Sequence, residues 1–195
     1  MIYIGINVYS PDYLINPTVI FIPVFIILLI IRIRRAFRQH TAIKKELLIF
    51  SFLYYLYNVS SLTIFPIFWF TNREPLPSYG QMPYLEKNPF LLYSNLNYYS
   101  LYNIIGNLLL FLPMGFYLGL FIKKYNMKQN AITIFLISLT IECIQLLMSF
   151  FYLGNRLFDI NDLLFNTIGG ILGYLLYLSP IGAYIAKLCA DTLRG

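Results

Sequence analysis

Residues 136–151 read LISLTIECIQLLMSFF, an apolar run with Glu142 and Gln145 at its middle. The run belongs to a longer apolar segment, residues 130–151, which is long enough to cross the hydrocarbon core of a bilayer as a helix. A carboxyl group that faces lipid is costly, so it is expected to face other polar groups instead. This stretch therefore predicts both a membrane-spanning helix and a polar site within the protein.

The composition of the whole chain favours a membrane protein. Of its 195 residues, 59% are apolar and only 11% are charged, whereas a soluble domain carries about 25% charged residues. So few charges cannot cover a surface that faces water. The chain is therefore expected to be an all-α, polytopic transmembrane helical bundle. No cleavable signal peptide is expected, because residues 1–13 contain no Lys or Arg.

Five apolar segments are long enough to cross a bilayer, which takes roughly 17 to 25 helical residues. They are residues 14–31, 47–69, 101–122, 130–151 and 163–179. We expect three regions: two spans with an external loop over residues 1–87, a three-helix core over 88–180, and a cytoplasmic tail over 181–195. The tail has the pattern of a short amphipathic helix that lies on the inner membrane surface.

The positions of the basic residues predict the orientation of the spans. Eleven Lys and Arg residues lie in the segments 32–45, 123–128 and 187–194, which fall on one side, and only three fall on the other. Because basic loops stay in the cytoplasm, the N-terminus is expected outside and the C-terminus in the cytoplasm. Topology and anionic lipid head groups thus account for the net charge of +6, and nucleic acid is not an expected partner.

Polar residues on and beside the last three spans are predicted to share the outer half of the membrane. They are Asn103, Asn107, Glu142, Gln145, Arg156, Asp159, Asp162 and Asn166. Polar groups need partners in hydrocarbon, so we expect these side chains to converge on one ligand-binding cleft that opens to the outside.

The same residues also have purely structural interpretations. Glu142 can be neutral and hydrogen-bonded to Gln145 or an asparagine, and the asparagines of the third span can hold helices together. Asp159 and Asp162 can serve as the cap and first-turn acid of the last span. Arg156 can form an ion pair with Asp159 or hold an anion.

Small residues on the third and fifth spans predict close packing of these helices against neighbours. They are Gly115, Gly119, Gly169, Gly170 and Gly173. Glycines four residues apart on a helix let two backbones approach closely. Pro113 is expected to bend the third span, because proline removes a backbone donor.

Three of these stretches, taken in order, resemble the motifs of the VanZ-like family of membrane proteins. They are GNLLLFLPMG (106–115), SLTIECIQ (138–145) and GNRLFDINDLLFNTIGGILG (154–173). The resemblance covers about residues 88–178 and does not clearly include the first two spans. It implies a protein of the cell membrane of a Gram-positive bacterium, from a family associated with low-level resistance to teicoplanin and related lipoglycopeptides.

Three functions are open at this point. The preferred one is a non-enzymatic envelope protein whose cleft binds a lipid-linked cell-wall precursor or a lipoglycopeptide, with membrane lipids as further partners. The second is an intramembrane enzyme acting on a lipid or isoprenoid phosphate, in which Asp159 and Asp162 hold Mg²⁺ and Arg156 contacts phosphate. The third is a small transporter that uses Glu142 as a proton carrier.

We expect no cofactor and no metal ion. Asp159 and Asp162 form a weak candidate for a metal site, because two carboxylates one helical turn apart supply few of the oxygen ligands that Mg²⁺ takes. The sequence also has no arrangement of His, Ser or Cys that would serve as an activated nucleophile. It predicts no particular oligomeric state.

Overall fold

The computed structural model describes residues 1–4, 6–39, 43–73, 76–80, 85–86, 98–122 and 124–193. Long helices dominate these residues, as the apolar segments predict. They are α1 (Pro17–Gln39), α2 (Ile43–Thr63), α4 (Tyr98–Phe121), α5 (Met127–Phe150), α6 (Ile160–Leu178) and α7 (Pro180–Leu193).

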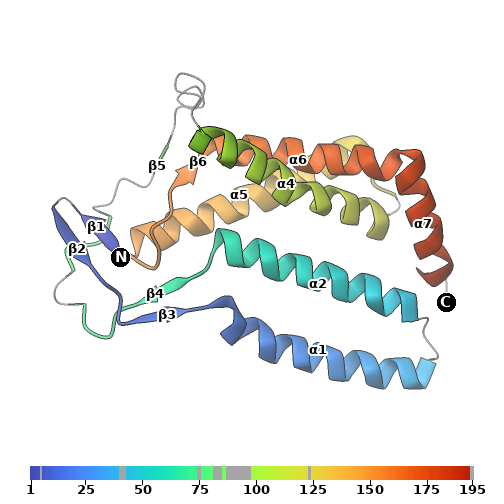
Figure 1. Cartoon of the computed structure of the whole chain (residues 1–195), viewed down its shortest axis with the longest axis horizontal. Helices are drawn as coiled ribbons and strands as arrows, with labels where there is room; N and C mark the ends of the chain where they lie inside the picture. Colours follow the sequence, from blue (N-terminus) through green and yellow to red (C-terminus); the bar gives the residue numbers. More distant parts are fainter. Residues whose placement is uncertain are drawn as a thin grey trace.

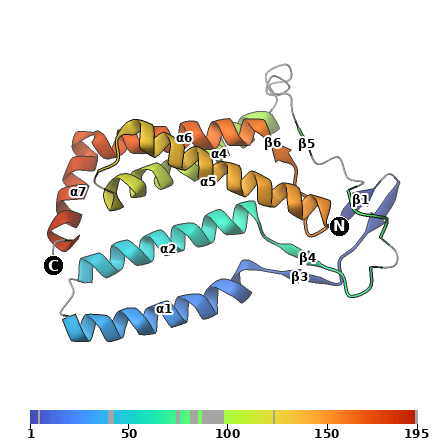
Figure 2. The ribbon, with the colours of Figure 1, turned by 180° about the vertical axis from the view of Figure 1, so that it is seen from behind.

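Five of the helices, α1, α2, α4, α5 and α6, lie side by side, and each runs opposite to the one before it (Figures 1 and 2). α1 and α2 are neighbours on one side of the molecule, and α4, α5 and α6 pack together on the other. α7 turns away from α6 by 74° at the end where the C-terminus lies. The predicted amphipathic tail is thus helical, and its position on the inner membrane surface stays a prediction.

Short strands lie at the opposite end, beside the N-terminus, and they correct the expectation of a purely helical chain. They are β1 (Ile2–Ile4), β2 (Asn7–Tyr9), β3 (Tyr13–Ile15), β4 (Ile67–Trp69), β5 (Leu85–Glu86) and β6 (Phe158–Asp159). β1 pairs with β2 and β3 with β4, both antiparallel, whereas β5 and β6 are parallel. The expected first span begins three residues before α1, because β3 takes residues 14 and 15 into its pairing with β4 and the helix begins only at Pro17.

The expected second span, residues 47–69, is also too long at its C-terminal end. α2 ends at Thr63, and Ile67–Trp69 form β4 instead. Pro66 explains this end, because a proline lacks a backbone donor and disfavours the helical conformation in the residue before it. The end of α2 consequently lies beside the start of α4 and α6, where it takes part in the site described below.

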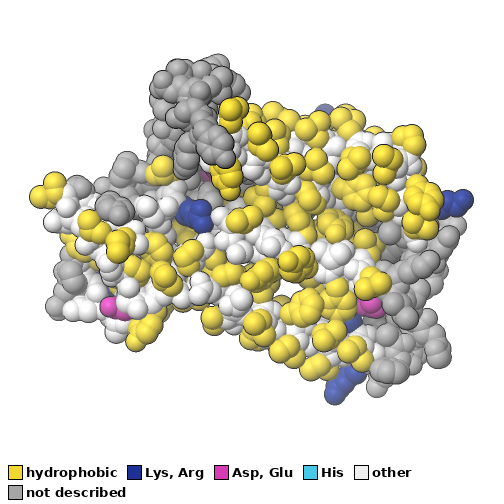
Figure 3. Space-filling view, viewed as in Figure 1, with side chains coloured by type: hydrophobic (Ala, Val, Ile, Leu, Met, Phe, Trp, Pro, Cys, Tyr) yellow, Lys and Arg dark blue, Asp and Glu magenta, His cyan; other side chains and the backbone are white. Residues whose placement is uncertain are grey.

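Three of the described helices contain segments long and apolar enough to cross a membrane: Pro17–Arg34, Leu101–Phe121 and Met127–Phe150. α6 and the start of α7 add a fourth if this bent pair counts as one span. α2 falls short because its C-terminal half, YYLYNVSSLT, is rich in polar side chains. Apolar side chains cover the helices on the face drawn in Figure 3, with charged groups near its two ends. This distribution is compatible with a membrane protein.

α4 and α6 form the closest helix pair of the molecule, and glycines allow it. A Cβ added to Gly173 would overlap the carbonyl oxygen of Leu112, and one added to Gly169 would overlap that of Leu108. Gly115 meets the backbone of α6 in the same way. Because these neighbours are backbone atoms, no side-chain rearrangement can make room for a larger residue.

Two further glycines face side chains instead of backbone. Gly170 lies against Ile134 of α5, and Gly119 lies against the ring of Tyr177. α4 continues as a helix through Pro113, so the proline does not interrupt it.

A small apolar core joins α2 to α4 and α5. Its buried members are Val59, Phe111, Met114, Ile134 and Ile141. The hydroxyl of Tyr55 adds a hydrogen bond of 2.7 Å to the carbonyl oxygen of Leu110. These contacts hold the C-terminal end of α2 against the helices that carry most of the predicted site residues.

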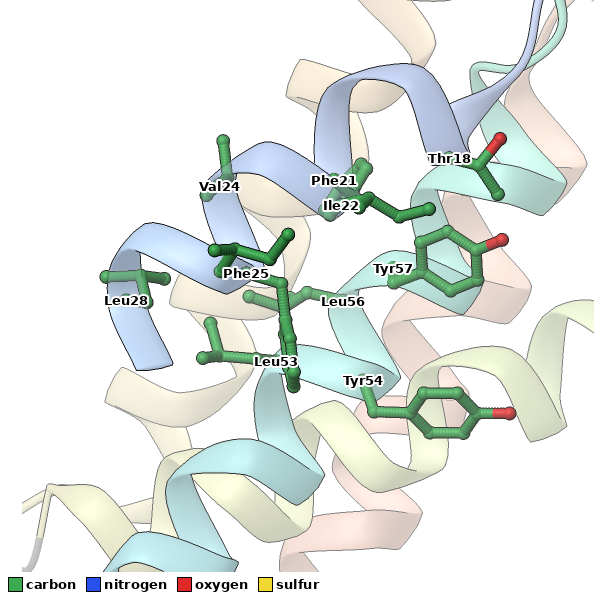
Figure 4. A pocket seen from close by; sticks show the side chains of 11 residues that line it. Thr18, Phe21, Ile22, Val24, Phe25, Leu28, Leu53, Tyr54, Leu56 and Tyr57 are labelled. Atoms are coloured by element: carbon green, nitrogen blue, oxygen red, sulfur yellow. The ribbon is translucent and has the colours of Figure 1, made fainter. Parts of the chain in front are cut away.

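α1 is attached mainly to α2. At the end far from the strands, the Arg32 guanidinium donates two hydrogen bonds to the Glu46 carboxylate, at 2.6 and 2.8 Å. Along the rest of the pair lies an apolar groove of about 310 Å³, in which Phe21 and Phe25 of α1 lie near Leu56 and Tyr57 of α2 (Figure 4).

Candidate functional site

A cavity of about 430 Å³ lies where α2 ends, α4 and α6 begin, and α5 passes between them. All eight residues proposed for the cleft line it: Asn103, Asn107, Glu142, Gln145, Arg156, Asp159, Asp162 and Asn166. The helix ends that form it lie toward the strand end of the molecule (Figure 1). Whether these residues bind a ligand stays a prediction, but their gathering around one cavity is a property of the fold.

Glu142 is the buried acid of this cavity, with 1% of its surface exposed. Its Oε2 accepts a hydrogen bond of 3.0 Å from the backbone N–H of Asp159. That N–H belongs to the junction between β6 and α6, so the carboxylate ties α5 to the start of α6. β6 is itself held by its pairing with β5.

Asp159 is the N-cap of α6, as its structural interpretation predicts. Its Oδ1 accepts from the backbone N–H of Asn161 at 2.8 Å and from the Asn161 side chain at 2.9 Å. A cap of this kind satisfies an N–H group that the helix leaves unpaired. The capped turn places Asp162 in the first turn of α6, facing α4.

The amide side chains link the helices around the cavity. The Nδ2 of Asn107 donates to the Oδ1 of Asp162, which joins α4 to α6. The Nδ2 of Asn166 donates to Ser138 Oγ at 3.0 Å, which joins α6 to α5. The side-chain nitrogen atoms of both asparagines therefore join one helix to another, which is the purely structural role of such residues.

Gln145 makes the corresponding link between α5 and α2. Its Nε2 donates to the carbonyl oxygen of Thr63 at 2.8 Å. The last carbonyl groups of a helix have no partner within the helix, so a side-chain donor is well placed there. α2 thereby closes one side of the cavity.

Arg156 does not form the expected ion pair with Asp159. Its guanidinium instead donates a hydrogen bond of 2.9 Å to the carbonyl oxygen of Phe65, in the segment between α2 and β4. Burial lowers the pKa of the Arg156 guanidinium, and the nearby Asp162 carboxylate acts in the opposite direction. A guanidinium still remains charged at neutral pH, because its ordinary pKa lies far above neutrality.

The structure adds lining residues that the sequence did not single out. They are Leu62, Thr63, Tyr102, Gly106, Leu110, Asn155 and Leu157. Four of them are direct chain neighbours of predicted site residues, so adjacency in the sequence was an available signal for them. Leu62 and Thr63 had no such signal, because α2 reaches the cavity only through tertiary packing.

The donor set does not suggest a bound metal ion. In the described part of the chain, no three His, Cys, Asp or Glu side chains gather in a way that could hold one. Asp159 already uses one carboxylate oxygen as the helix cap. The arrangement is instead suited to binding a polar group, with charged and amide side chains on one side and Leu62, Leu110 and Leu157 beside them.

Comparisons with known proteins give the family of the chain. The model of the VanZ/LLP1 family matches residues 48–182, which includes most of α2 as well as the three helices that carry the motifs. Protein VanZ of Enterococcus faecium is 35% identical to the chain over 74 residues, 38% of this chain and 43% of that relative. No solved structure matches the chain. With the family model covering more than half of its length, the chain belongs to the VanZ/LLP1 family.

Proposed function

We propose that this protein is a multi-pass cell-membrane protein that confers low-level resistance to teicoplanin-type lipoglycopeptides. Its polar cavity would bind a lipid-linked cell-wall precursor or the lipoglycopeptide and change how that molecule is exposed at the outer leaflet. The observation that carries the proposal is the gathering of eight polar side chains around one cavity among apolar helices. A polar cavity at the depth of a bilayer is retained for a function more often than for stability, because such groups are costly there.

A binding role is better supported than the two alternatives. For a lipid-phosphate enzyme, Arg156 would hold phosphate, but one nitrogen of its guanidinium donates to the carbonyl oxygen of Phe65, which leaves the other N–H groups for such a ligand. Asp159, which would hold Mg²⁺, caps α6. For a proton-carrying transporter, Glu142 should be able to alternate between two sides, but it is bonded to the start of α6.

The proposal includes five crossings, with α2 as a span, the N-terminus outside and the C-terminus in the cytoplasm. In a background that lacks Cys143 and Cys189, Ser10→Cys should react with a membrane-impermeant maleimide in intact cells. Lys124→Cys should react only after permeabilisation, since it lies in an exposed position at the opposite end of the bundle. Labelling of the Lys124→Cys protein in intact cells would contradict the orientation.

The resistance itself is tested with Glu142→Ala. Expression of the natural chain in a susceptible Gram-positive host should raise the inhibitory concentration of teicoplanin, and the Glu142→Ala chain should return it to that of cells without the protein. The reason is that the buried carboxylate both lines the cavity and holds the β6–α6 junction in place.

Cys143→Ala is the matched control. It truncates the neighbouring residue on α5, whose side chain is exposed, and should leave the resistance unchanged at equal expression. Full protection by the Glu142→Ala chain, at the same amount of membrane protein, would refute a role for the cavity.

A further inference from the structure

The described hydrogen bonds and ring contacts between α2 and α4 lie in the half of α4 that points away from the strands. The hydroxyl of Tyr55 donates to the carbonyl oxygen of Leu110 at 2.7 Å, and the hydroxyl of Tyr117 donates to Ser51 Oγ at 3.0 Å. The ring of Phe52 lies 5.0 Å from that of Tyr117. Between residues 101–109 of α4 and the described residues of α2 there is no hydrogen bond or ring contact.

In that other half, the cavity reaches the surface between the two helices. Tyr102, Gly106 and Leu110 line it from one face of α4, and Leu62 lines it from α2. Tyr102 is 67% exposed and Leu62 is 63% exposed. A Cβ added to Gly106 would meet no atom within 4 Å. The cavity is therefore open on this side, through a gap bounded by Leu62, Tyr102 and Gly106 that we call the portal.

The portal lies along the apolar part of α4. The segment of this helix that is long and apolar enough to cross a membrane begins at Leu101. From Tyr102 to Leu110 the lining covers about 12 Å of that segment, at the rise of an α-helix. Ile105 and Leu109 beside it are exposed as well. Such a rim is more stable against acyl chains than against water, because its apolar surface then stays out of water.

We infer that the cavity opens sideways into the outer leaflet through the portal and receives the polar head group of an amphiphile directly from the bilayer. The hydrocarbon chain of that molecule stays outside, against Leu62 and Leu109. The volume of about 430 Å³ suits a head group or a sugar-sized portion of one, and leaves no room for a long chain. This inference rests on the proposed function and adds to it the route of the ligand and the need for a chain.

The lining offers both donors and acceptors to a head group. Asn103 and Asn155 make no side-chain hydrogen bond within the described part of the chain, and one nitrogen of Arg156 donates to Phe65 while its other N–H groups are left over. Asp162 accepts from Asn107 through Oδ1, so its second oxygen is an available acceptor. Hydroxyl and amide groups, which donate and accept, suit such a lining.

The direction of the opening is tested with a nitroxide spin label on Gly106→Cys, in a background that lacks Cys143 and Cys189 and in vesicles of phosphatidylcholine. Molecular oxygen, which concentrates in the bilayer, should relax this label more strongly than a water-soluble nickel chelate does. Ile6→Cys is the control, because Ile6 is 98% exposed between β1 and β2 and its label should show the opposite preference. The same preference for the chelate at Gly106 would overturn the inference and leave the proposed function standing.

The need for the portal is tested with Gly106→Trp, whose ring would fill the gap. Ile105→Trp is the matched control, since it adds the same ring at the next residue of α4, which is exposed and does not line the cavity. Binding is measured in phosphatidylcholine nanodiscs, with nanodiscs that lack protein subtracted. Gly106→Trp should weaken binding about tenfold or more, and Ile105→Trp should not change it. Gly106→Leu, a smaller plug, should have an intermediate effect and shows that the loss follows side-chain size and not misfolding.

Two pairs of probes test the need for a chain and identify its source. One pair is a lipoglycopeptide and its deacylated form, and the other is a lipid-linked cell-wall precursor and its soluble nucleotide-linked counterpart. The form with a chain should bind about tenfold or more tightly in one of the pairs, because returning two methylene groups to water already costs about that factor. Chain-independent binding, or no binding, in both pairs would overturn the inference.

The resistance assay separates this inference from the proposed function. If Glu142→Ala abolishes resistance but the Gly106→Trp chain binds and protects as the natural chain does, the proposed function stands and the portal falls. If binding needs the chain and the open portal but the Glu142→Ala chain still protects cells, the resistance role falls and the portal stands.

Discussion

Gly173→Leu is expected to destabilise the helical core strongly. A single Cβ at this position would already overlap the carbonyl oxygen of Leu112, and the remaining leucine carbons would have to enter the same contact. α4 and α6 must then separate, and the hydrogen bond from Asn107 to Asp162 across them is lost with the packing. Overpacking costs typically about 1–3 kcal/mol, and a clash between backbones belongs at the upper end.

The measurements are the unfolding temperature of the purified protein in detergent and the fraction of it that elutes as a single species in size-exclusion chromatography. Gly106→Leu is the matched control, because it places the same side chain on α4 at a site where an added Cβ meets nothing within 4 Å. That protein should unfold at or above the temperature of the natural chain, since leucine favours the helix over glycine. If both variants were equally stable, close contact between α4 and α6 would not be what holds the core together.

Phe111→Ala is expected to have the second large effect on stability. Phe111 is 0% exposed and lies in the apolar core that joins α2 to α4 and α5. Removal of a buried phenylalanine side chain leaves a void and costs about 3–5 kcal/mol. Because this core holds α2 in place, the variant should also lose binding at the cavity, to which α2 contributes Leu62 and Thr63.

Leu109→Ala provides the control on the same helix. Leu109 is 61% exposed, so its truncation opens no internal void. The unfolding temperature of the Leu109→Ala protein should stay close to that of the natural chain. That of the Phe111→Ala protein should fall clearly. A similar change in both would mean that packing between α2 and α4 contributes little to stability.

The helices and most of the cavity residues could be predicted from the sequence because both follow from local patterns. Apolar runs of sufficient length form helices, and polar residues within them must be turned toward protein. The positions of Asn107, Glu142 and Asn166 within three such runs, at comparable depth, were enough to expect that they meet. The spacing of the glycines likewise indicated that α4 and α6 pack closely against other helices, but not that they pack against each other.

The short strands and the role of α2 could not be predicted in this way. β3 and β4 are separated by the whole of α1 and α2, so their pairing leaves no periodic signal in either segment. The motifs that resemble the family lie only in the last three helices, so they gave no sign that α2 belongs with them. The family match itself begins at residue 48, within α2.

The sequence by itself determined that this chain forms apolar helices and that a few polar side chains must share a protected place among them. Tertiary structure alone decided that α2 closes the cavity through Thr63 and that Arg156 turns to Phe65 and not to Asp159. It also decided that, among the residues the structure describes, the side-chain oxygen of Asn166 has no donor. The reason is physical: the need to bury or pair a group is a property of the residue. The choice of partner depends on which atoms the packed helices bring within hydrogen-bond distance.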